Sequence, residues 1–219
     1  MKILFATNNE AQKSFYESGL KISNVDIECL NLSDIKDKVK FEVRVDGINS
    51  TNIYEKRAVE YSRASNFITI SVDESLYIEG VSDENQPGRS IRRVKSFNEN
   101  GTYTTKKATD NEVVKYYADI IKKLGGRAKA KWISKVYVAY KGKTIKDFTM
   151  ENPIEFTSNA SKIINKGFPL DSLTLIPEFG DIHFSECTKE ETTFLHELKN
   201  KKLFNEIIAT IESIEEGEK

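Results

Sequence analysis

The chain has 219 residues, 38% of them hydrophobic, which is enough apolar material to enclose the core of one large domain. Lys and Arg number 33 and Asp and Glu 34, so a formal charge of -1 provides no overall field to attract nucleic acid or an anionic membrane. Cys29 and Cys187 have no metal-ligand spacing, and no secretory or membrane-spanning apolar run occurs. We therefore expect a cytoplasmic protein with reduced thiols, no nucleic-acid partner and no membrane partner.

The first third of the chain predicts alternating strands and helices. Ile3 to Ala6 is a short apolar run that gives way to a polar turn, and Phe67 to Val72 is a nearly continuous apolar run typical of a central strand. Between these runs we expect a helix from Ala11 to Ser18, a strand from Val25 to Leu32, and a helix from Asn52 to Ala64 capped by Ser50 or Thr51. This βαβαβ order favours parallel pairing of the strands.

The remainder of the chain predicts a different organisation. Turn residues place Ser82 to Gly101 in exposed loops, and Asp110 is expected to cap a helix that runs to Lys123. Alternating residues predict a hairpin with its turn at Lys141 and Gly142, between the strands Trp132 to Tyr140 and Lys143 to Phe156. Thr188 is expected to cap a last helix, interrupted near Asn200 and resumed from Leu203 to Ile214.

These elements together indicate the α/β class, with a mixed β-sheet, flanking helices and two lobes around a central cleft. Residues 1–219 are expected to form a single domain, within which a hairpin and helices around 110–170 would make the second lobe.

Two groups of polar residues follow strands and are candidates for chemistry. Asp73 and Glu74 come after the buried run and could hold Mg²⁺, although an adjacent acid pair can equally begin a solvated turn. Thr7, Asn8 and Asn9 lie between a strand and a helix, where free backbone N–H groups can bind phosphate, although ordinary turn and cap chemistry explains them too.

Three segments carry motifs in a recognisable order: FATNNEAQK, then SVDESLYIEGV with NQPGRSIRR, and then KGFPLDSLTLIPEFGDIHFSECTKEE. Together they resemble the inosine triphosphate pyrophosphatase family, also called XTP/dITP diphosphatases. FATNNEAQK is similar to the family's strand and T-G-N-x-x-K loop, and SVDESLYIEGV with NQPGRSIRR is similar to D-D-S-G-L followed by A-P-G-x-x-S-A-R. KGFPLDSLTLIPEFGDIHFSECTKEE resembles G-G-F-G-Y-D-P and the A-E-L/M-[ST]-x-E-E entrance to a last helix. The matches run from Thr7 to about Glu191.

The resemblance implies an enzyme that hydrolyses a nucleoside triphosphate, with a purine or an unusual purine base, to monophosphate and pyrophosphate. It further implies Mg²⁺ as cofactor, with Mn²⁺ as a substitute, and a homodimer. Asp73 and Glu74 match the catalytic acids, and Glu74, Asp73 and Glu55 are the candidate metal ligands. The candidate substrate-binding residues are Thr7, Asn8, Asn9, Lys13, Lys56, Ser75, Arg93, Phe168, Asp171 and His196. Among them, Phe168 matches the aromatic that stacks on the base.

Several family positions are replaced in this chain. Thr51 stands where the family has a metal-binding acid, which leaves Glu55, one helical turn away, as its substitute. Gln12 replaces the loop lysine and Lys13 comes one residue late, while Thr192 replaces a lysine of the last helix. Glu197 and Leu198 fall where a His-Arg pair reads a keto oxygen, and His196 comes one residue early. Base preference is therefore expected to differ.

These replacements keep two alternatives open. The chain could be a catalytically impaired nucleotide-binding or regulatory protein of the same fold. More distantly, it could be a partner-binding α/β protein whose charged segments Asp34 to Arg44 and Gly88 to Lys107 are interaction surfaces, although such charge runs are usually solvated faces.

Overall fold

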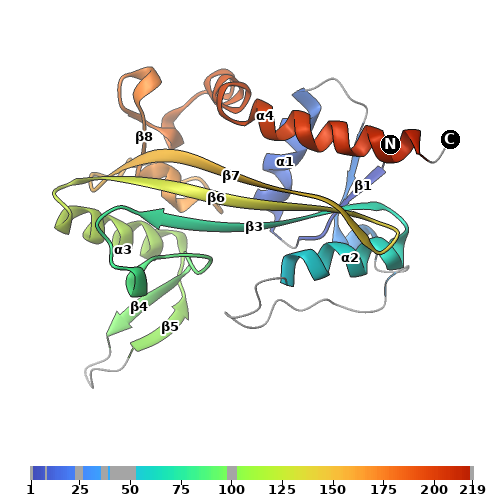
Figure 1. Ribbon diagram of the computed structural model, residues 1–219. Coiled ribbons are helices and arrows are strands. Elements are labelled where there is room, and N and C mark those ends of the chain that lie inside the picture. The colour runs from blue at the N-terminus through green and yellow to red at the C-terminus, as the bar shows by residue number, and fades with distance from the viewer. Residues whose placement is uncertain are drawn as a thin grey trace. The chain divides into compact units, whose positions relative to one another are not determined.

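A computed structural model describes residues 2–7, 9–22, 27–35, 39, 53–97 and 103–217 of the protein (Figure 1). Its helices are α1 (Glu10–Ile22), α2 (Ile53–Ser65), α3 (Asp110–Lys123) and α4 (Lys189–Glu216). Its strands are β1 (Lys2–Phe5), β2 (Glu28–Leu30), β3 (Ile68–Ile78), β4 (Arg93–Phe97), β5 (Tyr103–Lys107), β6 (Arg127–Tyr140), β7 (Lys143–Thr157), β8 (Thr174–Ile176) and β9 (Ile182–His183). Among the described residues, no helix is both long and apolar enough to cross a membrane.

Seven of these strands form one mixed sheet in the order β2-β1-β3-β6-β7-β8-β9. Strand β1 pairs in parallel with both β2 and β3, and Ile3 lies opposite Cys29 on one side and Ile68 on the other. Strand β8 pairs antiparallel with β7 and with β9. The α/β class, the mixed sheet and the flanking helices are therefore as the sequence predicted.

The predicted hairpin is present as β6 and β7. Its two-residue turn consists of Lys141 and Gly142, whose φ angles of 47° and 75° are both positive. Two successive residues of this conformation match the right-handed twist of the flanking strands, which makes such turns the favoured ones for tight hairpins. The local signal for the hairpin was therefore sufficient, although β6 begins five residues before the predicted Trp132.

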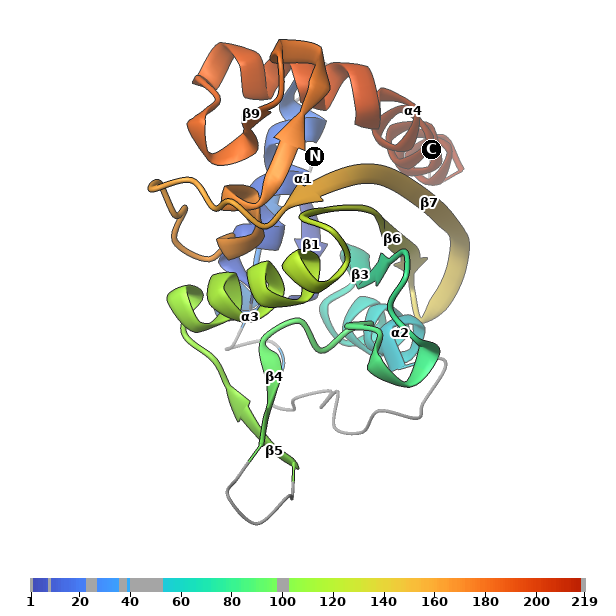
Figure 2. The same ribbon diagram turned by 90° about the vertical axis from the view of Figure 1, so that its left-hand side faces the viewer.

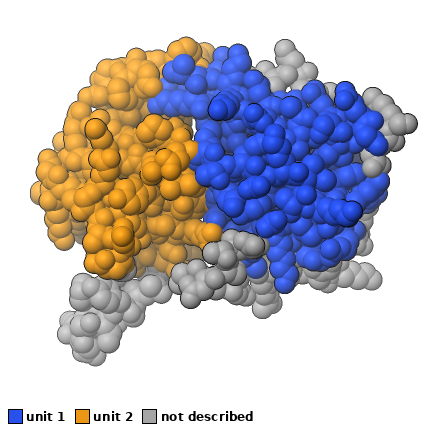
Figure 3. All heavy atoms as spheres, viewed as in Figure 1, with its two compact units in different colours: residues 1–73, 134–150, 195–219 blue, residues 74–133, 151–194 orange. Residues whose placement is uncertain are grey.

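The chain divides into two compact units, each with its own hydrophobic core (Figure 3). The first consists of residues 1–73, 134–150 and 195–219, and the second of residues 74–133 and 151–194. In the first unit α1 and α4 approach closely, because a Cβ atom on Gly19 would lie only 2.0 Å from the ring of Phe204. In the second unit, Val113, Tyr117 and Ile121 of α3 pack into the core.

The strand that carries the acid pair is longer than predicted. We expected it to end at Val72, so that Asp73 and Glu74 would follow it, but β3 continues to Ile78. Beyond the acids, Leu76 and Ile78 are buried, whereas Tyr77 between them is exposed. The buried run thus changes into an alternating pattern that covers one face only, and burial of those two side chains keeps the strand going.

The segment predicted as exposed loops contains a strand. Arg93–Phe97 forms β4, which pairs antiparallel with β5 in a separate two-stranded sheet (Figure 2). Val94 of β4 packs against the core of the second unit. The strand was not predicted, because its pairing partner lies beyond a stretch rich in turn residues.

Two helix boundaries also differ from the predictions. Thr109, not Asp110, caps α3, and it does so through a reciprocal capping box with Glu112. Helix α4 runs without the interruption expected near Asn200, which is a buried residue inside the helix. A polar side chain that tertiary packing buries need not end a helix, since intrinsic propensity is only a weak prior.

Candidate functional site

The turn between β1 and α1 uses its polar side chains to begin the helix. The Asn9 amide N–H donates to Thr7 Oγ1 at 3.1 Å, and the Gln12 amide N–H donates to Asn9 Oδ1 at 3.4 Å. Asn8 lies outside the described residues. Asn9 therefore caps helix α1, as the turn-and-cap interpretation of these residues predicts. The same helix N-terminus also has the polarity that favours binding of an anion.

Lys13, which comes one residue after the position of the family's loop lysine, lies on α1. It follows the helix start by one turn and lies on the face of α1 that also carries Glu17 and Lys21, each four residues further on. Burial raises the pKa of the Cys29 thiol on β2 to about 11, and the nearby charges of Lys13 and Lys21 oppose that rise. Lys13 is thus close enough to act on Cys29 electrostatically and belongs to the side of α1 near β2.

The two candidate residues of helix α2, Glu55 and Lys56, point their side chains in different directions. Glu55 is half-buried and accepts a hydrogen bond from Thr144 Oγ1 of β7 at 2.9 Å, whereas its neighbour Lys56 is exposed. One residue along a helix turns a side chain by about 100°, so the two cannot serve one face. Thr51 and Asn52 lie outside the described residues.

Asp73 and Glu74 differ in surroundings. Asp73 is buried, with 8% of its surface exposed, and Glu74 is half-buried. Because both lie inside β3, their side chains point to opposite faces of the strand. Ser75, two residues beyond Asp73, shares its face and donates a long hydrogen bond of 3.5 Å to the Ile133 carbonyl. The acid pair therefore offers one carboxylate to each face.

The side chains available as metal ligands decide whether the predicted Mg²⁺ could be bound here. In the part of the chain that the structure describes, no three His, Cys, Asp or Glu side chains gather into a group that could hold a metal. Mg²⁺ typically needs only one or two protein carboxylates and keeps several waters, so the chemistry of Glu74 or Glu55 fits that ion. The ion itself stays a proposal.

In the second unit, Phe168 is presented on a constrained turn. Its side chain is 39% exposed, its amide N–H donates to the Asn165 carbonyl at 2.9 Å, and Pro169 begins a short 3-10 helix directly after it. Within that helix Asp171 accepts from Asn165 Nδ2 at 3.2 Å, and burial raises the pKa of Asp171 to about 6. An exposed aromatic ring on a constrained turn suits stacking on a flat ligand such as a base.

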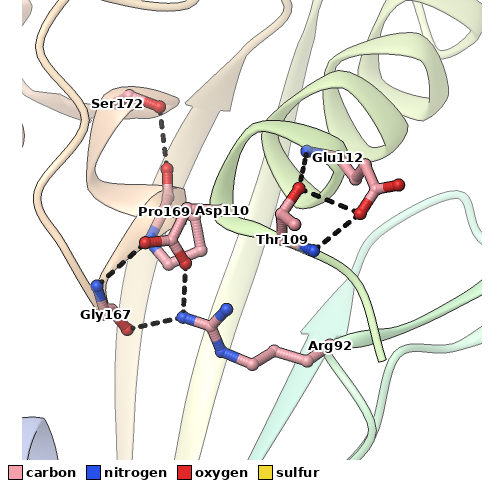
Figure 4. Close-up of polar contacts among 7 residues, drawn as sticks. All are labelled: Arg92, Thr109, Asp110, Glu112, Gly167, Pro169 and Ser172. Carbon is pink, nitrogen blue, oxygen red and sulfur yellow. Dashed lines mark hydrogen bonds and ion pairs between the residues drawn. The ribbon is translucent and has the colours of Figure 1, made fainter. Parts of the chain in front are cut away.

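The arginine that contacts this turn is Arg92, which was not predicted. Arg92 Nη2 lies 2.6 Å from Asp110 Oδ1 and donates to the Gly167 carbonyl at 3.1 Å, and the Gly167 amide donates to Asp110 Oδ2 at 3.1 Å (Figure 4). The predicted Arg93 is exposed and lies opposite Lys107 in the β4–β5 pair. No local signal marks Arg92, because Gly167 is 75 residues away in sequence.

His196 lies in the first unit, against α1. Its ring packs on Phe15 with centroids 4.7 Å apart, and burial lowers the pKa of the imidazole. Its Nδ1 atom is buried without a hydrogen-bond partner among the described residues. These contacts are those of a packing residue. The helix that carries it begins as predicted, with Thr188 and Glu191 in a capping box.

No protein-family model and no curated protein sequence matches the chain. Its fold, however, is similar to solved structures. The Staphylococcus aureus Ham1 protein superposes with a TM-score of 0.60 at 18% identity, covering 100% of both chains. A Ham1 protein from Coxiella burnetii gives 0.65 at 12% identity, covering 95% of this chain and 99% of that one.

A third similar structure is that of a nucleoside-triphosphatase, a dITP/XTP pyrophosphatase, from Mycobacterium abscessus. It superposes with a TM-score of 0.60 at 17% identity, over 93% of this chain and 96% of the other. At such identities the likeness concerns the fold. This protein therefore has the fold of the Ham1 and dITP/XTP pyrophosphatase structures, which is the fold that its sequence motifs predicted.

Proposed function

We propose that the protein is a Mg²⁺-dependent nucleoside triphosphate pyrophosphatase that releases monophosphate and pyrophosphate, with a base preference altered from that of its structural relatives. The observation that carries the proposal is the fold shared over at least 93% of the chain with structures that include a dITP/XTP pyrophosphatase. The motif resemblance in three segments supports it independently, because those motifs fall on the β1–α1 turn, on β3 and on the Phe168 turn.

The reaction requires a water aligned with the leaving pyrophosphate and neutralisation of the phosphate charges. A bound Mg²⁺ would supply charge neutralisation. Glu74 is the proposed metal-binding acid and Asp73 the acid that orients the water. These roles follow from the family motif that the two acids match.

Recognition is assigned to two turns. The N-terminus of α1 is the proposed phosphate site, because the first backbone N–H groups of a helix and its dipole favour an anion. Phe168 is the proposed stacking platform, worth on the order of 1–3 kcal/mol per base. Asp171 lies in the short 3-10 helix that follows Phe168, and its amide N–H donates to the Phe168 carbonyl at 3.2 Å. The proposal also includes assembly as a homodimer and a cytoplasmic location.

Pyrophosphate release from a panel of ordinary and modified nucleoside triphosphates, with Mg²⁺ or Mn²⁺, tests the proposal. We expect turnover of at least one purine nucleotide, with Asp73→Asn and Glu74→Gln each strongly impaired. Glu79→Gln, which changes an exposed acid just beyond β3, is the matched control and should keep full activity. No turnover in the wild type, or equal turnover in all variants, contradicts the proposal.

A second candidate is a nucleotide-binding protein without catalysis. The replacement of the family's metal-binding acid by Thr51 favours it, because Glu55, the proposed substitute, comes four residues later, one helical turn further along. Calorimetric binding of a nucleoside triphosphate with no pyrophosphate release would support this candidate over the first. Thermal stabilisation by nucleotide, through mass action on the folded state, provides a second readout.

A further inference from the structure

Both sides of Gly167 are held by the same ion pair. The Gly167 amide N–H donates to Asp110 Oδ2 and the Gly167 carbonyl accepts from Arg92 Nη2, each at 3.1 Å. Arg92 and Asp110 contact each other at 2.6 Å, so the three residues form a closed ring of contacts (Figure 4). We call this ring the Gly167 clamp. Charge-assisted hydrogen bonds of this kind are roughly twice as strong as neutral ones.

The two charged residues of the Gly167 clamp sit on fixed backbone. Asp110 is the first residue of α3, and the capping box of Thr109 with Glu112 fixes that end of the helix. The Arg92 carbonyl accepts from the Ala108 amide N–H at 2.8 Å, which ties Arg92 to the residue before the cap. An acid at a helix N-terminus is also favoured by the helix dipole. Arg92 and Asp110 are therefore held in place by contacts that do not involve Gly167.

The residue that follows Gly167 is Phe168. Gly167 has a φ of 90°, a conformation that needs an external contact to be selected from the many that glycine can adopt. After Phe168 the chain is restricted by Pro169, whose carbonyl accepts from Ser172 Oγ at 2.7 Å. The backbone after Phe168 is thus restricted by Pro169, and the backbone before it is held by the Gly167 clamp.

We propose that Arg92 and Asp110 are positioning residues that hold Phe168 in place for stacking on the base, and so determine affinity for the base portion of the substrate. This inference rests on the proposed function, which assigns base stacking to Phe168. Neither charged residue needs to touch the substrate, because the clamp acts through Gly167.

Kinetics of Arg92→Ala, Asp110→Ala and Phe168→Ala test the proposal, with a preferred purine nucleoside triphosphate and with a base-free triphosphate ester. For the nucleotide we expect KM to rise about tenfold in each variant with kcat little changed, since stacking energy is lost. For the base-free ester KM should not change. Combining Arg92→Ala with Phe168→Ala should add no further increase, because Arg92 acts through Phe168.

Arg127→Ala is the matched control, since Arg127 also forms ion pairs with two acids of the same unit, Glu155 and Asp181. It should leave both KM values unchanged. Arg92→Lys, which keeps a charged donor, should recover part of the affinity and covers the case in which Arg92→Ala does not fold. Fully additive effects of Arg92→Ala and Phe168→Ala, or an equal KM change for the base-free ester, overturn the inference while leaving the proposed function intact.

A measurement independent of turnover separates the two proposals further. Amide hydrogen exchange at Gly167 and Phe168, followed by NMR, should accelerate about tenfold in Arg92→Ala and not in Arg127→Ala. Unchanged exchange overturns the positioning role, whatever the enzyme does. A wild type that neither hydrolyses nor binds any nucleotide overturns the proposed function and the base-affinity role together.

Discussion

Glu55 of α2 accepts a hydrogen bond from the Thr144 hydroxyl of β7, with 2.9 Å between the two oxygen atoms. Both residues belong to the first compact unit. An ionised carboxylate has about four lone-pair sites, so this contact leaves acceptor capacity for a cation. A hydrogen bond that orients a metal ligand is a common supporting feature of metal sites. Thr144 would have this role if Glu55 replaces the acid that the family has at the position of Thr51.

Glu55→Gln is therefore expected to raise the Mg²⁺ concentration for half-maximal activity by more than about tenfold, and Thr144→Val by a smaller factor. Mg²⁺ titration of pyrophosphate release measures the change, and Mn²⁺ binding followed by electron paramagnetic resonance measures it without turnover. Glu60→Gln, on the same helix and paired with Arg63, serves as the control. If Glu55→Gln keeps the wild-type metal dependence, Glu55 is not a ligand.

Asp73→Asn and Glu74→Gln are expected to impair the enzyme in different ways, because Glu74 is the proposed metal ligand and Asp73 the proposed water-orienting acid. Glu74→Gln should raise the Mg²⁺ requirement. Asp73→Asn should lower kcat about 10²-fold or more even at saturating Mg²⁺, as loss of an acid–base group does. Kinetics over a range of Mg²⁺ concentrations distinguish these effects. Identical profiles for the two variants would contradict separate roles.

The fold could be predicted wherever its signals are local. The β1–α1 turn, the Lys141–Gly142 hairpin and the Thr188 cap each depend on a few neighbouring residues, and all three are present. The site was less predictable. The course of β3 through Asp73 depends on burial of Leu76 and Ile78 by other elements.

The contact between Arg92 and Gly167 could not be predicted either, because it too depends on residues that are distant in sequence. It joins residues that no sequence window contains, so a motif could indicate the loop but not the arginine within it that makes the contact. Arg92 pairs with Asp110, whereas its neighbour Arg93, which the motif matched, is exposed, and its contact with substrate stays a prediction.

The buried Asp171 carboxyl is expected to make the free energy of unfolding depend on pH. Burial raises its pKa to about 6, above the value of about 3.9 for an exposed Asp. As pH rises, the folded protein therefore keeps this proton to a higher pH than the unfolded chain does. Stability contributed by this group is thus fully present below about pH 4 and falls as pH rises towards 6, by about 2 kcal/mol. Asp171→Asn removes this loss.

Urea unfolding of the wild type and Asp171→Asn at pH 4 and pH 7 checks this sign. The variant should gain about 2 kcal/mol relative to the wild type between the two values. Asp119→Asn, on an exposed position of α3, corrects for the removal of one carboxyl. A stability difference that does not change with pH would show that Asp171 is solvated in the folded state.

His196 is expected to contribute to stability and not to base selection. Burial lowers its pKa, so the unfolded chain takes up the proton more readily and stability is lost as pH falls below about 6.5. His196→Phe keeps an aromatic ring against Phe15 and should remove that acid-dependent loss. Urea unfolding at pH 5 and pH 7.5 measures it, with His183→Gln as the control for the other histidine. The ratio of kcat/KM for 6-keto and 6-amino purine nucleotides should be the same in His196→Phe and the wild type, because we expect the ring to act by packing on Phe15 of α1. A tenfold or larger loss of that ratio would assign His196 to the base after all.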